Sequence, residues 1–119
     1  MITIEDFQKV EIRAGKILSA EKVPETDKLL KLSVDLGEEK PRQIISGIAA
    51  YFPDPTTLVG TTCAFAANLE PRTIRGLESQ GMIMAGSAAT LPIDPNSPSN
   101  PGAFTLLIMN GVPPGTKVK

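Results

Sequence analysis

Apolar and polar residues alternate without a break from Leu30 to Leu36, and this pattern constrains the fold more than any other feature of the chain. The apolar side chains of the segment LKLSVDL would share one face of a strand, because successive side chains of a strand point to opposite faces. The pattern predicts a half-buried strand, followed by a turn that Gly37 and Pro41 mark.

Short strands are predicted on both sides of this segment, while helix signals are few. Thr3 has the character of a helix N-cap for a single turn, and Pro53 and Pro55 limit any helix near Leu58 to a short connector. In the first of the other strands, Gly15 marks a bend or bulge. These further strands are predicted at 10–22, 42–48, 62–67, 81–85 and 103–109.

The tally of at least five short strands predicts an all-β fold, a small closed or nearly closed barrel. A five-stranded oligonucleotide-binding (OB) barrel is a leading candidate, and periodicity alone does not separate it from other small barrels. At 119 residues the chain fits one domain, 1–119, with a C-terminal extension. The Pro, Asn and Ser residues of 92–102 predict an exposed loop.

Composition excludes several kinds of chemistry. The chain has no histidine, which removes the usual triad base and most zinc sites, and we expect no metal or other cofactor. Its one cysteine, Cys63, lies in an apolar run and is expected to be a buried thiol. No apolar run approaches the ~20 residues of a membrane span and no signal pattern begins the chain, so we expect a cytoplasmic protein.

The segment NLEPRTIRGLESQGM, 68–82, combines groups that suit a polyanionic ligand. The guanidinium groups of Arg72 and Arg75 can each make two hydrogen bonds to phosphate oxygens. Glycines would let the backbone approach a ligand, and neutral polar side chains suit sugar hydroxyls or unpaired bases. The alternative is a solvated loop whose arginines pair with Glu70 and Glu78, and spacing alone favours it. The glycines are Gly76 and Gly81, and the polar residues are Asn68, Ser79 and Gln80.

Other cations extend the candidate surface. Lys28 and Lys31 flank the start of the strand at 30–36, where they are either solvated strand ends or phosphate contacts. With Arg42 they would hold the site if the two arginines of 68–82 were paired internally. The net charge is −1, and the aromatic residues form no paired motif for stacking bases. Recognition of a folded RNA by its backbone and shape is therefore favoured over single-strand binding.

Four stretches together resemble a known family: DFQKVEIRAGKI, DKLLKLSVDLGEEKPRQIISGIA, ANLEPRTIRGLESQGMIMA and VPPGTKVK. They are similar to the tRNA-binding domain appended to many methionyl-tRNA synthetases, which also occurs as free-standing tRNA-binding proteins and in the endothelial-monocyte-activating polypeptide family. The resemblance covers nearly the whole chain outside 92–102. It implies an OB fold, tRNA as the ligand and, from the bacterial members, a homodimer with a composite site for the outer corner of tRNA.

The resemblance also implies site residues. The family pattern ANLKPRKLxGxxSxGM maps onto Asn68, Arg72, Gly76, Ser79, Gly81 and Met82. The chain departs from it at Glu70 and Thr73, where lysine is usual, and Arg75 restores one positive charge nearby. Fewer phosphate contacts would release fewer counterions, so the departures predict weaker non-specific binding.

The resemblance does not extend to synthetase catalysis, because a chain without histidine cannot carry the His-Ile-Gly-His signature. We expect a non-catalytic tRNA-binding module, either free-standing or part of a methionyl-tRNA synthetase, whose catalytic part is then a further partner. The alternative is a chaperone-like dimer that binds proteins, since secretion chaperones share the fold and the DF-x-KV-x-I-R-x-G opening. The DKLLKL and SQGM stretches favour tRNA binding. A hydrolase ranks below both, because no nucleophile and base pair stands out.

Overall fold

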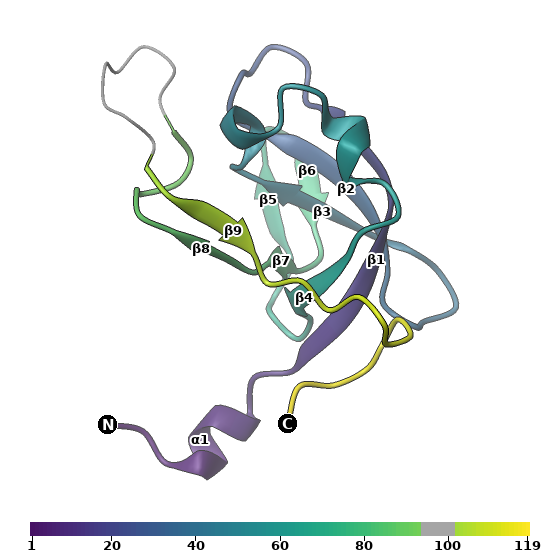
Figure 1. Cartoon of the computed structure of the whole chain (residues 1–119), viewed down its shortest axis with the longest axis vertical. Helices are drawn as coiled ribbons and strands as arrows, with labels where there is room; N and C mark the ends of the chain where they lie inside the picture. Colours follow the sequence, from purple (N-terminus) through teal and green to yellow (C-terminus); the bar gives the residue numbers. More distant parts are fainter. Residues whose placement is uncertain (94–101) are drawn as a thin grey trace.

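Antiparallel strands wrap around one hydrophobic core in the structure, a computed structural model that describes residues 1–93 and 102–119 (Figure 1). Short helices precede and connect the strands. In chain order the elements are α1 (Ile4–Gln8), β1 (Ile12–Lys22), β2 (Leu30–Asp35), β3 (Arg42–Ser46), the 3₁₀ helices η1 (Ala49–Tyr51) and η2 (Pro55–Leu58), β4 (Thr62–Ala66), β5 (Arg72–Ile74), β6 (Leu77–Ser79), β7 (Met82–Ile83), β8 (Ala85–Ser87) and β9 (Phe104–Leu106).

The main sheet has five strands in the order β3-β2-β1-β4-β7, and all the neighbours are antiparallel. The alternation that opened the sequence analysis is confirmed, because β2 buries every second residue toward the barrel interior. The predicted all-β, OB-type barrel is also confirmed. The short connector near Leu58 is confirmed as η2, in which Asp54 caps the first turn by accepting a hydrogen bond from the Thr56 amide.

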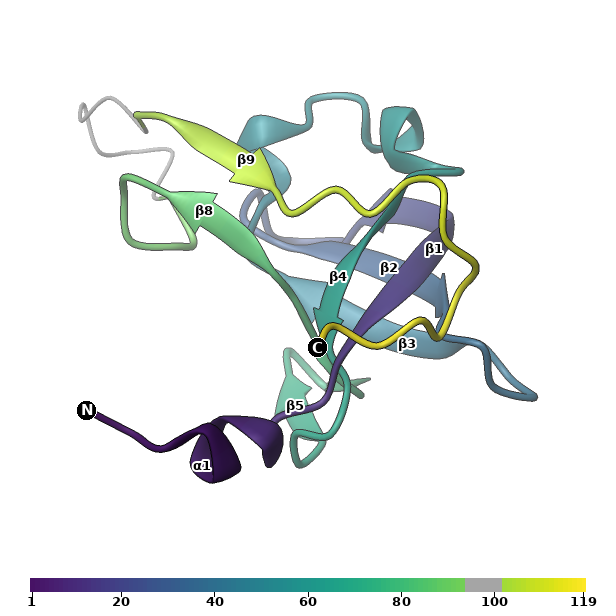
Figure 2. The same cartoon turned by 60° about the horizontal axis from the view of Figure 1, so that its bottom comes forward.

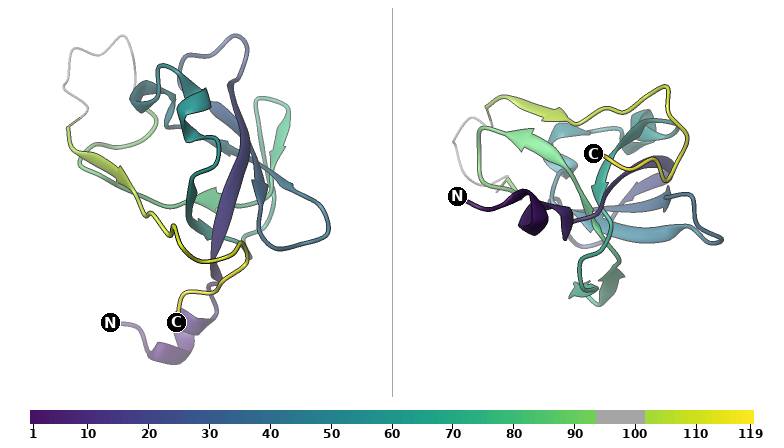
Figure 3. Two further views of the ribbon diagram at one scale, coloured as in Figure 1. Left: turned by 45° about the vertical axis from the view of Figure 1, so that its right-hand side comes forward. Right: turned by 90° about the horizontal axis from the view of Figure 1, so that it is seen from below.

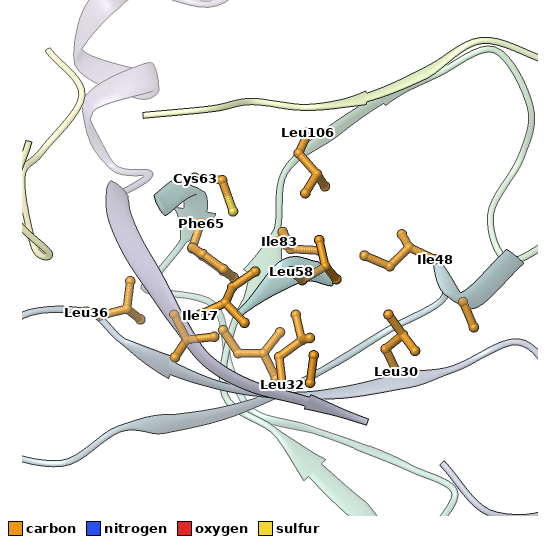
Figure 4. Packing of buried hydrophobic residues seen from close by; sticks show 14 of the residues in the cluster. Ile17, Leu30, Leu32, Leu36, Ile48, Leu58, Cys63, Phe65, Ile83 and Leu106 are labelled. Carbon is orange, nitrogen blue, oxygen red and sulfur yellow. The ribbon is translucent and has the colours of Figure 1, made fainter. Parts of the chain in front are cut away.

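The barrel interior is filled by aliphatic side chains from all the main strands and from both 3₁₀ helices (Figure 4). Phe65 is fully buried among them, and so is Cys63. Desolvation raises the pKa of the Cys63 thiol to about 12, so the expected buried and unreactive thiol is confirmed. The other fully buried large side chains are Ile17, Leu30, Leu32, Leu36, Ile44, Ile48 and Val34.

Gly15 has a different role from the one predicted. The pairing of β1 with β4 runs through Gly15 without a shift, and the bulge of β1 lies between Ile17 and Ser19. A Cβ atom on Gly15 would come within 2.6 Å of the Phe65 ring and 2.7 Å of a Val34 methyl group. The glycine therefore makes room for core side chains, and the predicted bend at this position is wrong.

The predicted strand at 81–85 is also corrected. The chain forms β7 over two residues and then leaves the barrel at Met84 to begin β8, which pairs with β9. The β8–β9 ribbon extends away from the barrel beside η1 (Figure 1). Within the predicted strand 103–109, only Phe104–Leu106 is regular, and Ile108 makes an isolated bridge to Cys63. The predicted loop at 92–102 lies mostly outside the described residues.

The N-terminal helix leads into β1, and the C-terminal segment forms backbone hydrogen bonds with the first residues of the same strand. Thr3 caps α1 as predicted, because its hydroxyl accepts a hydrogen bond from the Asp6 amide at 3.1 Å. The C-terminal extension runs back along β1 and β4 (Figure 2), and backbone hydrogen bonds join Thr116 to Ala14 and Val118 to Ile12. Among the described residues, no helix is long and apolar enough to cross a membrane.

Candidate nucleic-acid interface

A β-hairpin occupies the middle of segment 68–82, where the sequence predicted a loop. Strands β5 and β6 are joined by Arg75 and Gly76, with φ angles of 53° and 78°. Two successive residues with positive φ form a two-residue turn whose backbone twist matches the twist of the strands that it joins. Gly76 therefore serves the turn, and the expectation of an irregular loop is wrong here.

The hairpin is fixed to the barrel by its own small apolar cluster. Ile74 and Leu77 face each other across the hairpin and pack against Val23, Leu29 and Ile45. Figure 3 shows the hairpin standing beside the barrel. Cross-strand partners share one face of a hairpin, so the Arg72–Ser79 pair lies on the same face as this apolar pair.

The two arginines of the hairpin are exposed and have no carboxylate partner among the described residues. Glu78 pairs with Thr73 on the opposite face of the hairpin from Arg72, so it cannot neutralise that guanidinium. The alternative in which Arg72 and Arg75 pair with acidic neighbours is therefore not what the structure has. Both guanidinium groups are available to a ligand.

The other two arginines of the chain are held by internal bonds. Arg42 donates to both carboxylate oxygens of Glu38 at 2.7 Å, and also to the backbone carbonyls of Ala67 and Gln80. Its hydrogen bond to Glu38 raises the pKa of Arg42 and lowers the pKa of the Glu38 carboxyl. The guanidinium of Arg13 donates to Glu11 at 2.6 Å. Arg42 thus links the chain at Glu38, Ala67 and Gln80, and these internal bonds leave fewer of its N–H groups for a ligand.

Ser79 is buried, with only 4% of its surface exposed. Its hydroxyl accepts a hydrogen bond from the Ile45 amide at 3.0 Å and donates to the Gly81 carbonyl at 3.1 Å. The expectation of an exposed segment is therefore wrong at this serine. Its position indicates that it holds β6 against β3.

Gln43 and Gln80 complete the join between β3 and the hairpin. The Gln80 amide donates to the Gln43 carbonyl at 2.8 Å, and the Gln80 side chain accepts from the Gln43 amide at 3.0 Å. The Gln43 side chain in turn donates to the Glu78 carbonyl at 2.9 Å. Sequence reasoning missed Gln43, because nothing in its neighbours signals a partner 37 positions away.

Asn68 fastens the N-terminal segment to the barrel. Its side chain accepts from the Glu11 amide at 2.8 Å and donates to the Lys9 carbonyl at 2.6 Å.

Gly81 and Met82 follow the hairpin. Gly81 fits a tight site, since a Cβ atom there would lie 3.1 Å from the Ala66 carbonyl oxygen. Met82 is 49% exposed beside the hairpin and remains accessible. Of the residues implied by the resemblance, the structure brings Arg72 and Met82 to the lining of one groove.

The two predicted lysines differ in their contacts. Lys31 projects from β2 and pairs with Glu21 of β1 at 2.8 Å, so its charge is partly neutralised. Lys28 precedes β2, where its carbonyl accepts a hydrogen bond from Ala49. Among the described residues, no cluster of three or more His, Cys, Asp or Glu could hold a metal ion. Of the predicted cationic site residues, Lys28, Arg72 and Arg75 therefore have no carboxylate partner among the described residues.

Known protein families and relatives match most of the chain. Residues 12–113 match the family described as a putative tRNA-binding domain. The methionine–tRNA ligase of Methanoregula boonei is 52% identical over 102 residues, which are 86% of this chain and 15% of the ligase. The chain thus spans about 15% of the length of such ligases.

Solved structures show the same fold over the full chain. A protein related to methionyl-tRNA synthetase from Pyrococcus horikoshii superposes with a TM-score of 0.82 and 32% identity, covering 100% of this chain and 98% of that one. The chaperone CsaA of Bacillus anthracis superposes with a TM-score of 0.77 and 26% identity, covering 100% and 99%. In the methionine–tRNA ligases, a domain of this family is an accessory, non-catalytic part. The chain therefore belongs to the tRNA-binding domain family of methionyl-tRNA synthetases and their relatives.

Proposed function

We propose that the chain binds folded tRNA through the face that the β5–β6 hairpin presents, reading the RNA backbone and shape. The observation that carries this proposal is the contrast between the arginines. Arg13 and Arg42 are bonded to carboxylates, while Arg72 and Arg75 lie on one hairpin and have no carboxylate partner among the described residues. An unpaired guanidinium suits a phosphate oxygen pair, and the hairpin holds two of them at a fixed position.

Removing both charges tests the proposal. The double variant Arg72→Ala/Arg75→Ala should lower tRNA affinity and flatten its dependence on salt, because each lost phosphate contact removes counterion release. The matched control is Lys16→Ala/Lys40→Ala, which removes the same charge from exposed positions outside the hairpin. A filter-binding titration across salt concentrations measures both slopes. Equal losses in the two variants would mean that only net charge matters, and the hairpin site would be wrong.

We also propose that the chain forms a homodimer through α1, which projects from the barrel in Figure 1 and in the left view of Figure 3. None of the five residues of α1 is buried, and a helix this short is not stable by itself in water. Its apolar side chains nevertheless include Ile4 and Phe7, exposed at 63% and 41%. A second copy would cover them, in agreement with the dimer that the family resemblance implies.

The apolar C-terminal strand uses part of its surface within its own subunit. Leu106 is buried in its own subunit, and exposed apolar surface remains at Leu107 and Ile108. Sedimentation equilibrium at micromolar concentration should show a dimer, and Phe7→Asp should convert it to a monomer. Val59→Asp, at another exposed apolar position, is the control and should remain dimeric. A monomeric wild-type protein would overturn this proposal.

A second candidate function is a chaperone-like binding of apolar protein segments. It is favoured by a groove of about 480 Å³ in which Phe104 stacks on Tyr51 at 4.0 Å and meets Phe52 edge-on. This groove is lined without a charged side chain, unlike the hairpin face. Ile108→Glu should abolish binding of an unfolded apolar peptide if this function holds and should leave tRNA binding unchanged.

In a longer ligase, the module would add a second tRNA contact to that of the catalytic part, which raises the effective affinity without new chemistry. A cytoplasmic location follows from that role. Comparing tRNA KM for the ligase with and without the module tests it, since a tethered second contact should lower KM while leaving kcat nearly unchanged.

A further inference from the structure

A second groove, of about 510 Å³, lies between the β5–β6 hairpin and the segment that leads out of β8. Its floor consists of Ile45, Ile48 and Ile83, which are at most 5% exposed. Met82 and Leu91 form parts of its walls. The volume lies within the roughly 300–1,000 Å³ that small-molecule sites occupy.

The polar groups of this groove are few and unpaired. Arg72 is the only charged residue among its lining residues, and its guanidinium has no hydrogen-bond partner within the described part of the chain. Ser46 also lines the groove, and its hydroxyl makes no hydrogen bond with a described residue. An apolar slot with one cation and one hydroxyl at its edge is complementary to a flat, weakly polar group that is attached to an anion.

We infer that this groove receives a single unpaired nucleotide of the bound RNA. Its base would lie on the isoleucine floor between Ile74 and Met82, its phosphate would meet Arg72, and Ser46 would hydrogen-bond to the base edge or the sugar. The inference rests on the proposed RNA-binding function and adds a substrate feature to it. A nucleotide splayed out of a loop or bulge offers its base faces to protein, whereas a base in a duplex does not.

Charge favours RNA over a peptide as the occupant. The guanidinium of Arg75, which also has no ion pair within 1–93 and 102–119, lies on the same hairpin as Arg72, so an occupant that continues past the groove meets another cation. A polyanion gains from both, and an uncharged apolar peptide gains from neither. The aromatic groove at Phe104 has no cation on its lining and offers no such complement.

The experiment uses the full chain and two RNA hairpins that differ at one position. One hairpin carries a single bulged 2-aminopurine, and the other has the same stem fully paired. Burial of the bulged base should change its fluorescence saturably, and the protein should prefer the bulged RNA. Met82→Ala should weaken binding of the bulged hairpin about fivefold through lost apolar contact and leave the paired hairpin unchanged. Ile108→Ala, 52% exposed in the other groove, is the matched control and should change neither.

The outcomes separate the two proposals. Equal affinity for the two hairpins with unchanged fluorescence would overturn the nucleotide slot while leaving tRNA binding standing. Failure of the protein to bind tRNA or either hairpin would overturn both. Met82→Leu keeps the apolar wall and should restore the preference for the bulged RNA, which tests whether Met82→Ala acts through the groove or through a folding defect. Competition by an apolar peptide but not by RNA would assign the groove to protein ligands and refute the inference.

Discussion

Ser79→Ala distinguishes a structural serine from an RNA contact. The substitution removes the hydroxyl that accepts from the buried Ile45 amide at 3.0 Å and donates to the Gly81 carbonyl at 3.1 Å. Leaving a buried amide without an acceptor costs about 1–3 kcal/mol. Water can reach the Gly81 carbonyl more easily than the amide, because Gly81 is only partly buried. We therefore expect the free energy of unfolding to fall by about 2 kcal/mol.

Urea unfolding and thermal melting measure this loss. For a 119-residue domain, a decrease of about 2 kcal/mol should lower Tm by about 8 °C, with an unchanged urea m-value. Ser33→Ala is the control, because the Ser33 hydroxyl makes no hydrogen bond with a described residue, and its effect should stay within about 0.5 kcal/mol. Under conditions where it is folded, the Ser79→Ala variant should bind tRNA more tightly than the Arg72→Ala variant. Unchanged stability with a large loss of affinity would refute the structural role and make Ser79 a direct contact.

Three other predictions concern Gly15, Glu38 and the pair of Glu70 and Thr73. Gly15→Ala should lower stability by about 1–3 kcal/mol in a thermal melt, since its Cβ would lie 2.6 Å from a fully buried ring, while Gly86→Ala, whose Cβ would lie 3.6 Å from its nearest neighbour, should be tolerated. Glu38 has a folded-state pKa below its ordinary 4.5, so its stabilising effect is fully present above pH 4.5 and is lost as the pH falls from there through the lower folded-state pKa; Glu38→Gln should reduce the acid sensitivity of Tm. Glu70→Lys/Thr73→Lys should raise tRNA affinity and steepen its salt dependence; an unchanged slope would place the RNA elsewhere.

Local patterns were sufficient for much of the barrel. Alternation identifies β2, and the N-cap at Thr3 identifies α1, because both signals depend on neighbours a few positions away. The apolar run around Cys63 likewise indicated burial. The sequence resemblance also identified the family, which the comparisons confirm.

The hairpin was missed because its signals conflict with the usual ones. A two-residue turn of this type ordinarily carries Asn-Gly or Asp-Gly, and here Arg75 takes the first position with φ of 53°. Its strands are three residues each, too short for a clear alternation. The apolar cluster that holds them includes Ile45 of β3, a residue far away in the sequence.

The sequence by itself determined the main barrel strands, the buried thiol and the family, since each depends on local pattern or on the order of motifs. Which polar residues are free was decided only by tertiary structure. Arg42 and Arg72 are the same residue type, yet one is bonded to Glu38 and two carbonyls while the other faces a groove. Hydrogen bonds between residues tens of positions apart depend on how the strands close the barrel. That closure, and not the local sequence, buries Ser79 and leaves Arg72 and Met82 accessible.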